Sequence, residues 1–205
     1  MRKTRLCIAA VIAFLLPLAS LAGNYAKKVN TLIGTDYTGN TYPGAQAPFG
    51  MVQLSPDNGL PGWDRIAGYF YPDSTIAGFS HTHLSGTGAG DMYDISFMPV
   101  TLPMREAKAP LGVYSRFSHN DETAHAGYYQ VRLTDYDINV ELTATPRCGV
   151  QRYTFPKNGK ERMVILNLAK AMNWDATTDS KITVVDSFTI EGYRFSDGWA
   201  RNQKV

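Results

Sequence analysis

The second half of the chain alternates between apolar and polar residues with a period of two. Runs of five to seven residues with this pattern, rich in β-branched and aromatic side chains, occupy residues 127–133, 138–144, 149–155, 163–168, 181–185 and 188–194. Turn sequences such as Asn158-Gly159 and Asp197-Gly198 separate them. Repeated strands of this kind, without helical periodicity between them, predict an all-β fold built as an antiparallel β-sandwich.

The first half of the chain has a different texture. Between Gly34 and Gly90 lie eleven of the 18 glycines, and we expect loops to dominate residues 24–105. Short strands are predicted at 50–54, 69–71 and 95–100, and one short helix near 25–32. Long ordered loops on a rigid scaffold commonly carry function, so candidate sites are sought here.

The extreme N-terminus reads as an export signal. Arg2, Lys3 and Arg5 precede an apolar run at residues 6–18, and the sequence Ser20-Leu21-Ala22 then places small residues at positions 20 and 22, where a signal peptidase reads them. This pattern predicts a signal peptide over residues 1–22, and the apolar run is too short for a membrane span. An uncleaved membrane anchor is the less favoured alternative. We therefore expect an exported protein, in the periplasm, at the cell surface or outside the cell, with no transmembrane segment after cleavage.

Composition and charge narrow the class further. The 44% of hydrophobic and 19% of charged residues are typical of a globular protein. The formal net charge is +2, but three of the 20 basic residues fall in the predicted signal, so the mature chain carries about −1. Neither value favours nucleic acid as a partner. Cleavage also removes Cys7 and leaves Cys148 alone, which we expect to be a partly buried structural side chain.

The densest polar constellation is at residues 79–91. His81 and His83 would point to the same face of a strand, where they could bind a ligand, line an interface or be satisfied structural histidines. A zinc site is disfavoured because no third ligand is fixed by spacing. The glycine-rich stretch after Ser85 resumes a strand instead of opening a helix, which argues against a dinucleotide-binding loop.

Trp63 and Asp64 form a second candidate site in a turn-rich loop. An indole ring can pack against the apolar face of a sugar, while a carboxylate accepts hydrogen bonds from its hydroxyl groups. The alternative is a tryptophan packed in the core beside an Arg–Asp pair. A glycosidase also needs two positioned carboxyl groups, and no spacing in this sequence identifies such a pair.

A set of motifs in fixed order resembles a known family. The motifs occupy residues 39–57, 76–88, 117–124, 141–149 and 198–200. In this order they are similar to the N-terminal domain of glycoside hydrolase family 92, whose members are exported, calcium-dependent, inverting, exo-acting α-mannosidases. The resemblance covers essentially all of the mature chain.

The resemblance implies a larger architecture than this chain contains. It implies a β-sandwich domain at residues 23–205, which we expect to be incomplete at its C-terminal end because 195–205 reads as the start of another strand. A helical (α/α)₆ barrel would follow, carrying the general acid, the general base and most calcium ligands. We therefore place no catalytic residue on this chain, and its calcium ligands stay unknown.

The loops of this domain are implied to form one wall of the pocket for a mannose-containing glycan, with terminal α-1,2-linked mannose as the expected substrate. The expected mechanism is a single displacement assisted by calcium. A non-catalytic carbohydrate-binding module and a structural exported β-sandwich are the alternatives. The glycine-rich segment 39–44 is expected at the pocket or at a domain interface. The residues predicted to bind substrate are Trp63, Asp64, His81, His83, Ser85 and Gly86.

Overall fold

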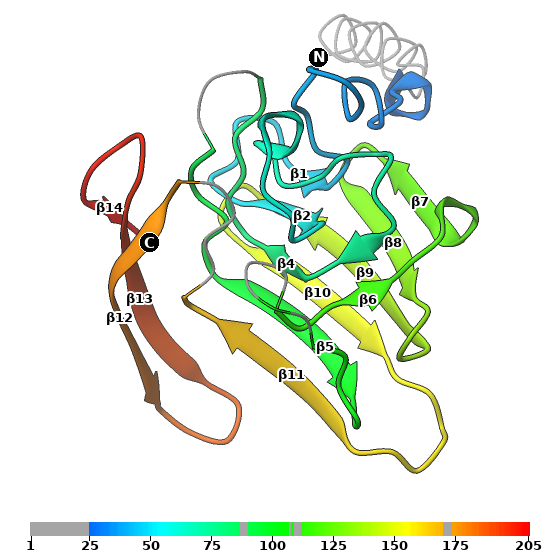
Figure 1. The fold of residues 1–205 in the computed structure, drawn as a ribbon, viewed down its shortest axis with the longest axis vertical. Coiled ribbons are helices and arrows are strands. Elements are labelled where there is room, and N and C mark those ends of the chain that lie inside the picture. The colour runs from blue at the N-terminus through cyan, green and yellow to red at the C-terminus, as the bar shows by residue number, and fades with distance from the viewer. Residues whose placement is uncertain (1–24, 87–89, 107, 109–111, 170–173) are drawn as a thin grey trace, which may run out of the picture.

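The computed structural model describes residues 25–86, 90–106, 108, 112–169 and 174–205. Within these ranges every strand pairing is antiparallel and there is no α-helix (Figure 1). The predicted all-β class is therefore confirmed. No helix in the described ranges is long and apolar enough to cross a membrane. The signal peptide predicted at residues 1–22 lies outside the described residues.

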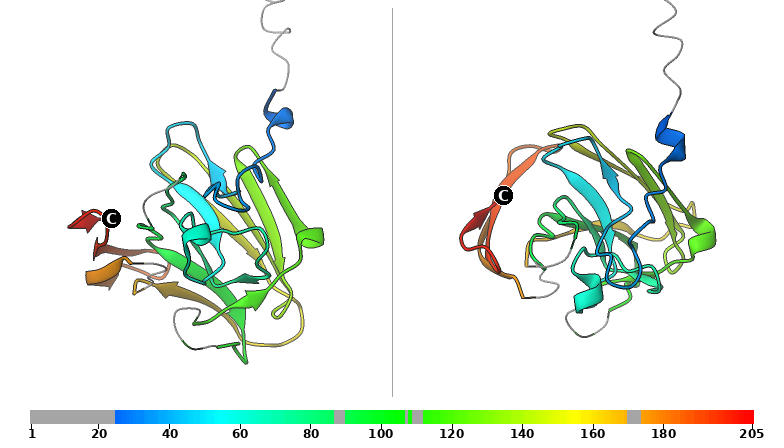
Figure 2. Two further views of the ribbon diagram at one scale, coloured as in Figure 1. Left: turned by 45° about the horizontal axis from the view of Figure 1, so that its top comes forward. Right: turned by 90° about the horizontal axis from the view of Figure 1, so that it is seen from above.

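Two large sheets form the sandwich (Figures 1 and 2). One has five strands in the order β1-β2-β4-β5-β11, and the other has four in the order β10-β9-β8-β7. The strands of the first are β1 (Ala45–Gln46), β2 (Gln53–Asp57), β4 (Gly78–Ser80), β5 (Ser96–Thr101) and β11 (Arg162–Asn167). Those of the second are β7 (Glu122–His125), β8 (Tyr128–Leu133), β9 (Ile138–Ala144) and β10 (Gly149–Thr154).

Smaller elements complete the chain. A three-stranded sheet contains β12 (Ala176–Val184), β13 (Ile190–Asp197) and β14 (Gln203–Lys204), and β3 (Thr75–Ile76) pairs with β6 (Ser115–Arg116). The 3₁₀ helices are η1 (Tyr25–Lys28), η2 (Trp63–Arg65) and η3 (His119–Asp121). Figure 2 shows the three-stranded sheet standing to one side of the sandwich.

The core lies between the two large sheets. On β8 and β9, alternate residues such as Val131, Ile138 and Val140 are fully buried, while those between them are partly exposed. They pack in one cluster with Leu54 and Phe79 from the five-stranded sheet. The sheet that contains β8 and β9 has one buried face and one solvent-exposed face, and this produces the period-two pattern of the sequence.

A buried arginine attaches the three-stranded sheet to the sandwich. Arg194 of β13 is fully buried and forms an ion pair with Asp94 and a second one with Asp175, the latter at 3.0 Å. Its Nε also donates to the carbonyl of Leu168 and to the hydroxyl of Thr177. Because Asp94 precedes β5 in the sandwich, this cluster joins the two parts of the fold.

The far end of the β12–β13 hairpin is apolar and exposed. Ile182, Val184 and Ile190 are 46%, 73% and 51% exposed, and Phe188 in the turn is 99% exposed. Beneath the hairpin, against β5 and β11, is a cavity of about 340 Å³ lined by residues that include Phe97 and Ile182.

Three expectations from the sequence were wrong. Residues 69–71 form no strand, because the backbone turns at Phe70 and the buried Tyr69 hydroxyl donates to the Glu122 carboxylate at 2.9 Å. The helix near 25–32 is reduced to the single turn of η1. Cys148, expected to be partly buried, is exposed in the connection between β9 and β10.

Removal of the Arg194 guanidinium should destabilise this domain. In the full-length protein, Arg194→Leu leaves Asp94 and Asp175 buried without their cation. We expect a loss of about 3–5 kcal/mol, which corresponds to a fall of about 10 °C in the Tm of this domain by calorimetry.

Arg132→Leu is the matched control, because Arg132 and its partner Asp137 are both more than half exposed. Its Tm should stay close to that of the wild type. Equal Tm values for the two variants would show that the buried cluster does not hold the sheet in place.

Candidate functional site

Trp63 lies in η2 and is 53% exposed. Its ring stacks on Trp174, with 6.2 Å between the ring centroids and 24° between the planes. Trp174 precedes β12 and is 44% exposed. The two indoles therefore form an open aromatic surface, which disagrees with the alternative of a tryptophan packed in the core.

The two charged neighbours of Trp63, Asp64 and Arg65, differ in their contacts. Arg65 donates from Nε and one terminal nitrogen to both oxygens of Asp73, at 2.7 and 2.6 Å, and its guanidinium lies 4.5 Å from the ring centroid of Phe70. This bidentate pair fixes the end of η2. The partly exposed Asp64 carboxylate forms no hydrogen bond or ion pair among the described residues, so it is available to accept one from a ligand.

His83 is held inside the protein. It is 3% exposed, its Nδ1 lies 2.7 Å from the carbonyl oxygen of Gln53, and its Nε2 lies 2.8 Å from Oδ1 of Asp57. The Ser80 hydroxyl lies 3.1 Å from the same Nε2. A nucleophilic triad needs its serine and carboxylate on opposite ring nitrogens, so this arrangement is not one. The contacts favour the interpretation of His83 as a satisfied structural histidine.

His81 occupies a different environment. Strand β4 ends at Ser80, and the Nδ1 of His81 lies 2.8 Å from the carbonyl oxygen of Ile95. Its ring meets the edge of Phe97 and lines the cavity beneath the β12–β13 hairpin. Burial lowers the pKa of His81 from its ordinary value of 6.5, and the neighbouring His83 adds to this effect. The two histidines therefore contribute to different surroundings.

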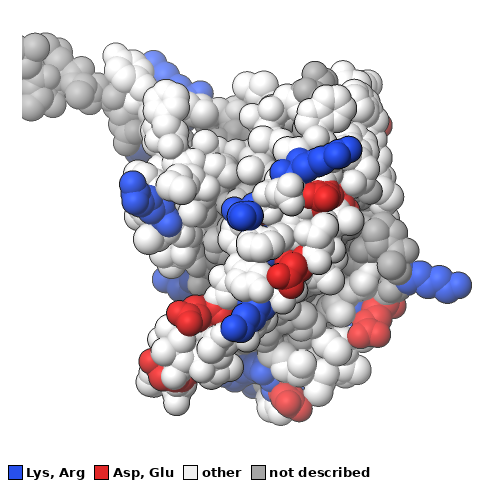
Figure 3. Space-filling view, turned by 90° about the vertical axis from the view of Figure 1, so that its left-hand side faces the viewer, with Lys and Arg blue, Asp and Glu red and all other residues white. Residues whose placement is uncertain are grey.

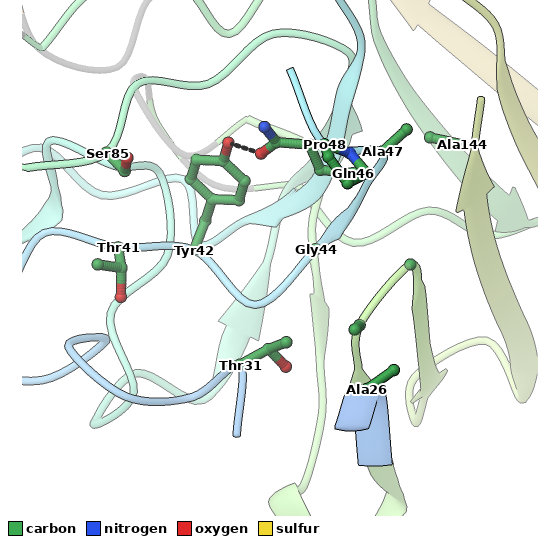
Figure 4. Close-up of a pocket in the computed structure, with 12 residues that line it drawn as sticks. Ala26, Thr31, Thr41, Tyr42, Gly44, Gln46, Ala47, Pro48, Ser85 and Ala144 are labelled. Atoms are coloured by element: carbon green, nitrogen blue, oxygen red, sulfur yellow. Dashed lines mark hydrogen bonds between the residues drawn. The ribbon is translucent and has the colours of Figure 1, made fainter. Parts of the chain in front are cut away.

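Ser85 lines a second and larger cavity of about 740 Å³ (Figure 4). The cavity is bordered by Thr41, Tyr42 and Gly44 from the predicted glycine-rich segment. Gly86, next to Ser85, donates its backbone N–H to the carbonyl of Asn40 at 2.6 Å. The structure thus brings Ser85 and Gly86 together with segment 39–44, as one candidate site, while Trp63 and Asp64 are not among the residues that line this cavity.

The polar groups of this cavity are unevenly satisfied. Tyr42 donates to Oε1 of Gln46 at 2.5 Å, and burial raises the pKa of Tyr42 to about 12, so its hydroxyl stays a donor at neutral pH. The hydroxyl of Thr31, on the cavity wall, is buried and has no hydrogen-bond partner among the residues that the structure describes. Gly44 admits no side chain, because a Cβ there would lie 1.9 Å from the carbonyl oxygen of Leu54.

A calcium or other metal site does not emerge from the described residues. They contain no group of three or more His, Cys, Asp or Glu side chains placed to hold a metal ion. The calcium implied by the family resemblance therefore stays a prediction, with most of its ligands expected outside this chain, and no chemical step is assigned to a metal here.

Sequence reasoning did not identify Trp174 as part of the site. The stack with Trp63 joins segments that are far apart in the chain, and no local sequence pattern predicts such a contact. The only available signal was that the chain contains just three tryptophans, each beside or one residue from an aspartate or glycine.

Comparison with known proteins gives a consistent assignment. The family model described as the glycosyl hydrolase family 92 N-terminal domain matches residues 28–205. A curated relative from Arthroderma benhamiae, described as an uncharacterized secreted glycosidase, is 28% identical over 153 residues, which cover 70% of this chain and 19% of that protein.

Two solved structures are similar to this fold. A family GH92 alpha-mannosidase from Bacteroides thetaiotaomicron, determined in complex with mannoimidazole, is 37% identical with a TM-score of 0.82, over 87% of this chain and 24% of that one. A family GH92 inverting mannosidase from the same species is 29% identical with a TM-score of 0.65, over 85% and 23%. This chain spans between about a fifth and a quarter of the length of these relatives.

The depressed pKa of His81 predicts a pH dependence of stability. Below about pH 6.5 the unfolded chain binds a proton at His81 that the folded protein resists, so stability falls as the pH is lowered toward the folded-state pKa. His81→Gln removes this contribution and keeps a donor for the Ile95 carbonyl. The Tm advantage of wild type over the variant should therefore shrink from about pH 7.5 to about pH 5, and parallel profiles would contradict the assignment.

Proposed function

The chain belongs to the glycosyl hydrolase family 92 N-terminal domain family, and from this premise we propose that it is the N-terminal part of an exported, exo-acting α-mannosidase. The substrate is terminal mannose on a glycan, with α-1,2-linked mannose as the preferred residue. The observation that carries the proposal is the likeness to a solved α-mannosidase over 87% of the chain at 37% identity.

The role of this domain is to supply one wall of the sugar pocket. Two regions support it: the exposed Trp63 ring beside the Asp64 carboxylate, and the cavity that Ser85 shares with segment 39–44. Indole faces and unpartnered carboxylates match the apolar faces and hydroxyl edges of a pyranose. His83 supports the Ser85 cavity from inside, since its ring packs against Tyr42 and both its ring nitrogens face other protein groups, whereas His81 lines the separate cavity beneath the β12–β13 hairpin.

The proposed mechanism is a single displacement. A carboxylic acid protonates the leaving oxygen while a carboxylate, roughly 6.5–9.5 Å away, activates water on the opposite face of the sugar. We assign both groups, and the ligands of the calcium that assists them, to a helical catalytic domain outside the described residues. Within this chain the work is to bind the sugar, to orient it and to exclude water from that side of the pocket.

A non-catalytic carbohydrate-binding role is the second candidate. It is favoured by the same aromatic surface, because the stacked Trp63 and Trp174 rings and Asp64 could hold a sugar without a partner domain. The two functions differ in whether the full-length protein releases mannose or only binds it.

We expect the full-length protein to release mannose with inversion at the anomeric carbon. Full-length protein incubated with methyl α-1,2-mannobioside, whose leaving group is a methyl mannoside and not free mannose, should release mannose, and proton NMR during the first minutes should detect the β-anomer ahead of the α-anomer. The physical reason is that one displacement inverts the anomeric carbon. Initial release of the α-anomer would contradict the mechanism, and binding without turnover would favour the carbohydrate-binding role.

We expect the Trp63 ring to contribute to substrate affinity. Trp63→Ala in the full-length enzyme should raise KM for mannobiose about tenfold, equivalent to about 1.4 kcal/mol, because the stacking face is lost. Trp63→Phe keeps an aromatic face and should recover most of the affinity. An unchanged KM for the alanine variant, with unchanged Tm, would favour a structural role for this loop.

A further inference from the structure

All three tryptophans of the chain are exposed, at 53% for Trp63, 44% for Trp174 and 74% for Trp199. Large exposed indoles on a folded domain are unusual enough to need a reason when they gather in one region. The Trp63–Trp174 stack has been described above. The position of Trp199 follows from the register of the three-stranded sheet.

Strands β12 and β13 pair to the end of their ladder at Ala176 and Asp197. The next residue along β13, Gly198, lies against the backbone next to Ala176, since a Cβ on Gly198 would be 3.2 Å from the Cα of Asp175. Trp199 follows Gly198 in the turn between β13 and β14, and Trp174 directly precedes Asp175. The two indoles are therefore carried by adjacent backbone segments at one end of this sheet.

A buried carboxylate fixes the turn that carries Trp199. Asp91 is 2% exposed and accepts hydrogen bonds from the backbone N–H groups of Trp199 and Ala200, at 2.8 and 2.9 Å. It also accepts one from Nε2 of Gln203 at 2.8 Å. A side chain at Gly198 would collide with Asp91, at 2.1 Å. An exposed ring on so constrained a backbone loses little conformational entropy when it binds a ligand.

The chemistry of this end of the sheet differs from that of the opposite end. The hairpin end is aliphatic, with Ile182, Val184 and Ile190, a composition suited to packing against protein. The other end carries flat aromatic rings, and beside Trp63 in η2 lies the Asp64 carboxylate, which is unbonded within the described part of the chain. Figure 3 shows the face that carries this sheet: positive and negative side chains are interspersed, with uncharged surface between them. Rings and scattered charges suit an uncharged ligand rich in hydroxyl groups.

We propose that Trp174 and Trp199 extend the Trp63 surface outward and bind sugar residues of the glycan that lie beyond the mannose being removed. The inference rests on the proposed glycosidase function and deepens it, because it assigns a preference for longer oligosaccharides to two residues at the end of the β12–β13 ladder. Trp199, the most exposed of the three, is the outermost contact.

The test compares substrates of different length in the full-length enzyme. Trp174→Ala and Trp199→Ala should each lower the ratio of kcat/KM for an α-mannotetraose to kcat/KM for an aryl α-mannoside by about tenfold. The change should appear in KM and not in kcat, because such contacts are made equally in the ground and transition states. Phe188→Ala is the matched control, because Phe188 is a still more exposed aromatic residue at the opposite end of the same sheet, and it should leave the ratio unchanged.

An unchanged ratio in both tryptophan variants would overturn the inference. An equal fall in kcat/KM for both substrates, together with a lowered Tm, would also overturn it, because that result indicates that these rings pack against the rest of the enzyme. Calorimetric titration of the same proteins with α-mannotetraose separates this inference from the proposed function. If the wild type binds α-mannotetraose and the variants bind it about tenfold more weakly, the role of Trp174 and Trp199 is supported even where no mannose is released. If an active wild-type enzyme does not bind it, the inference is overturned.

Discussion

The ion pairs of Arg194 are the interaction on which the arrangement of this domain depends. One guanidinium, removed from solvent, joins β13 to Asp94 at the edge of the sandwich and to Asp175 at the start of its own sheet. A buried pair is weak evidence for stability by itself, but it demands exact partners and so fixes geometry. The ion pairs of Arg194 therefore fix the place of the three-stranded sheet against the sandwich.

The consequences of this arrangement reach both candidate regions. Asp175 follows Trp174, so the position of the Arg194 cluster also sets the position of the ring that stacks on Trp63. Asp91 and Asp94 belong to one short segment between the serine-bearing loop and β5, and they bind two successive parts of the three-stranded sheet. The segment 91–94 follows the loop that carries Ser85 and leads into β5 of the sandwich. Its two carboxylates bond to Arg194 of β13 and to the turn that carries Trp199, so it links the sandwich to the aromatic surface.

The sequence was informative where one physical requirement dominated. The bounds of β9 were predicted as observed, because burial of one face and hydration of the other impose a strict alternation on residues 138–144. The start of β12 was missed because residues near Asp179 are polar on both faces, in a sheet whose faces are largely exposed. Trp63 and Asp64 could be named from chemistry, and their exposure agrees with a binding role. The internal partners of His83 could not, since Gln53 and Asp57 reach it only through the pairing of β2 with β4.

The contacts made by Arg194 and Asp91 also bear on the order of events when the chain folds. Asp94 is separated from Arg194 by 100 residues, and Asp91 from Gln203 by 112. Closing such long loops is slow, and during synthesis neither carboxylate can meet its partner until almost the whole domain has emerged. Asp91 and Asp94 therefore keep their hydration until Arg194 and Gln203 have reached them. In the exported protein proposed above, these ion pairs and hydrogen bonds would form only after the chain has crossed the membrane.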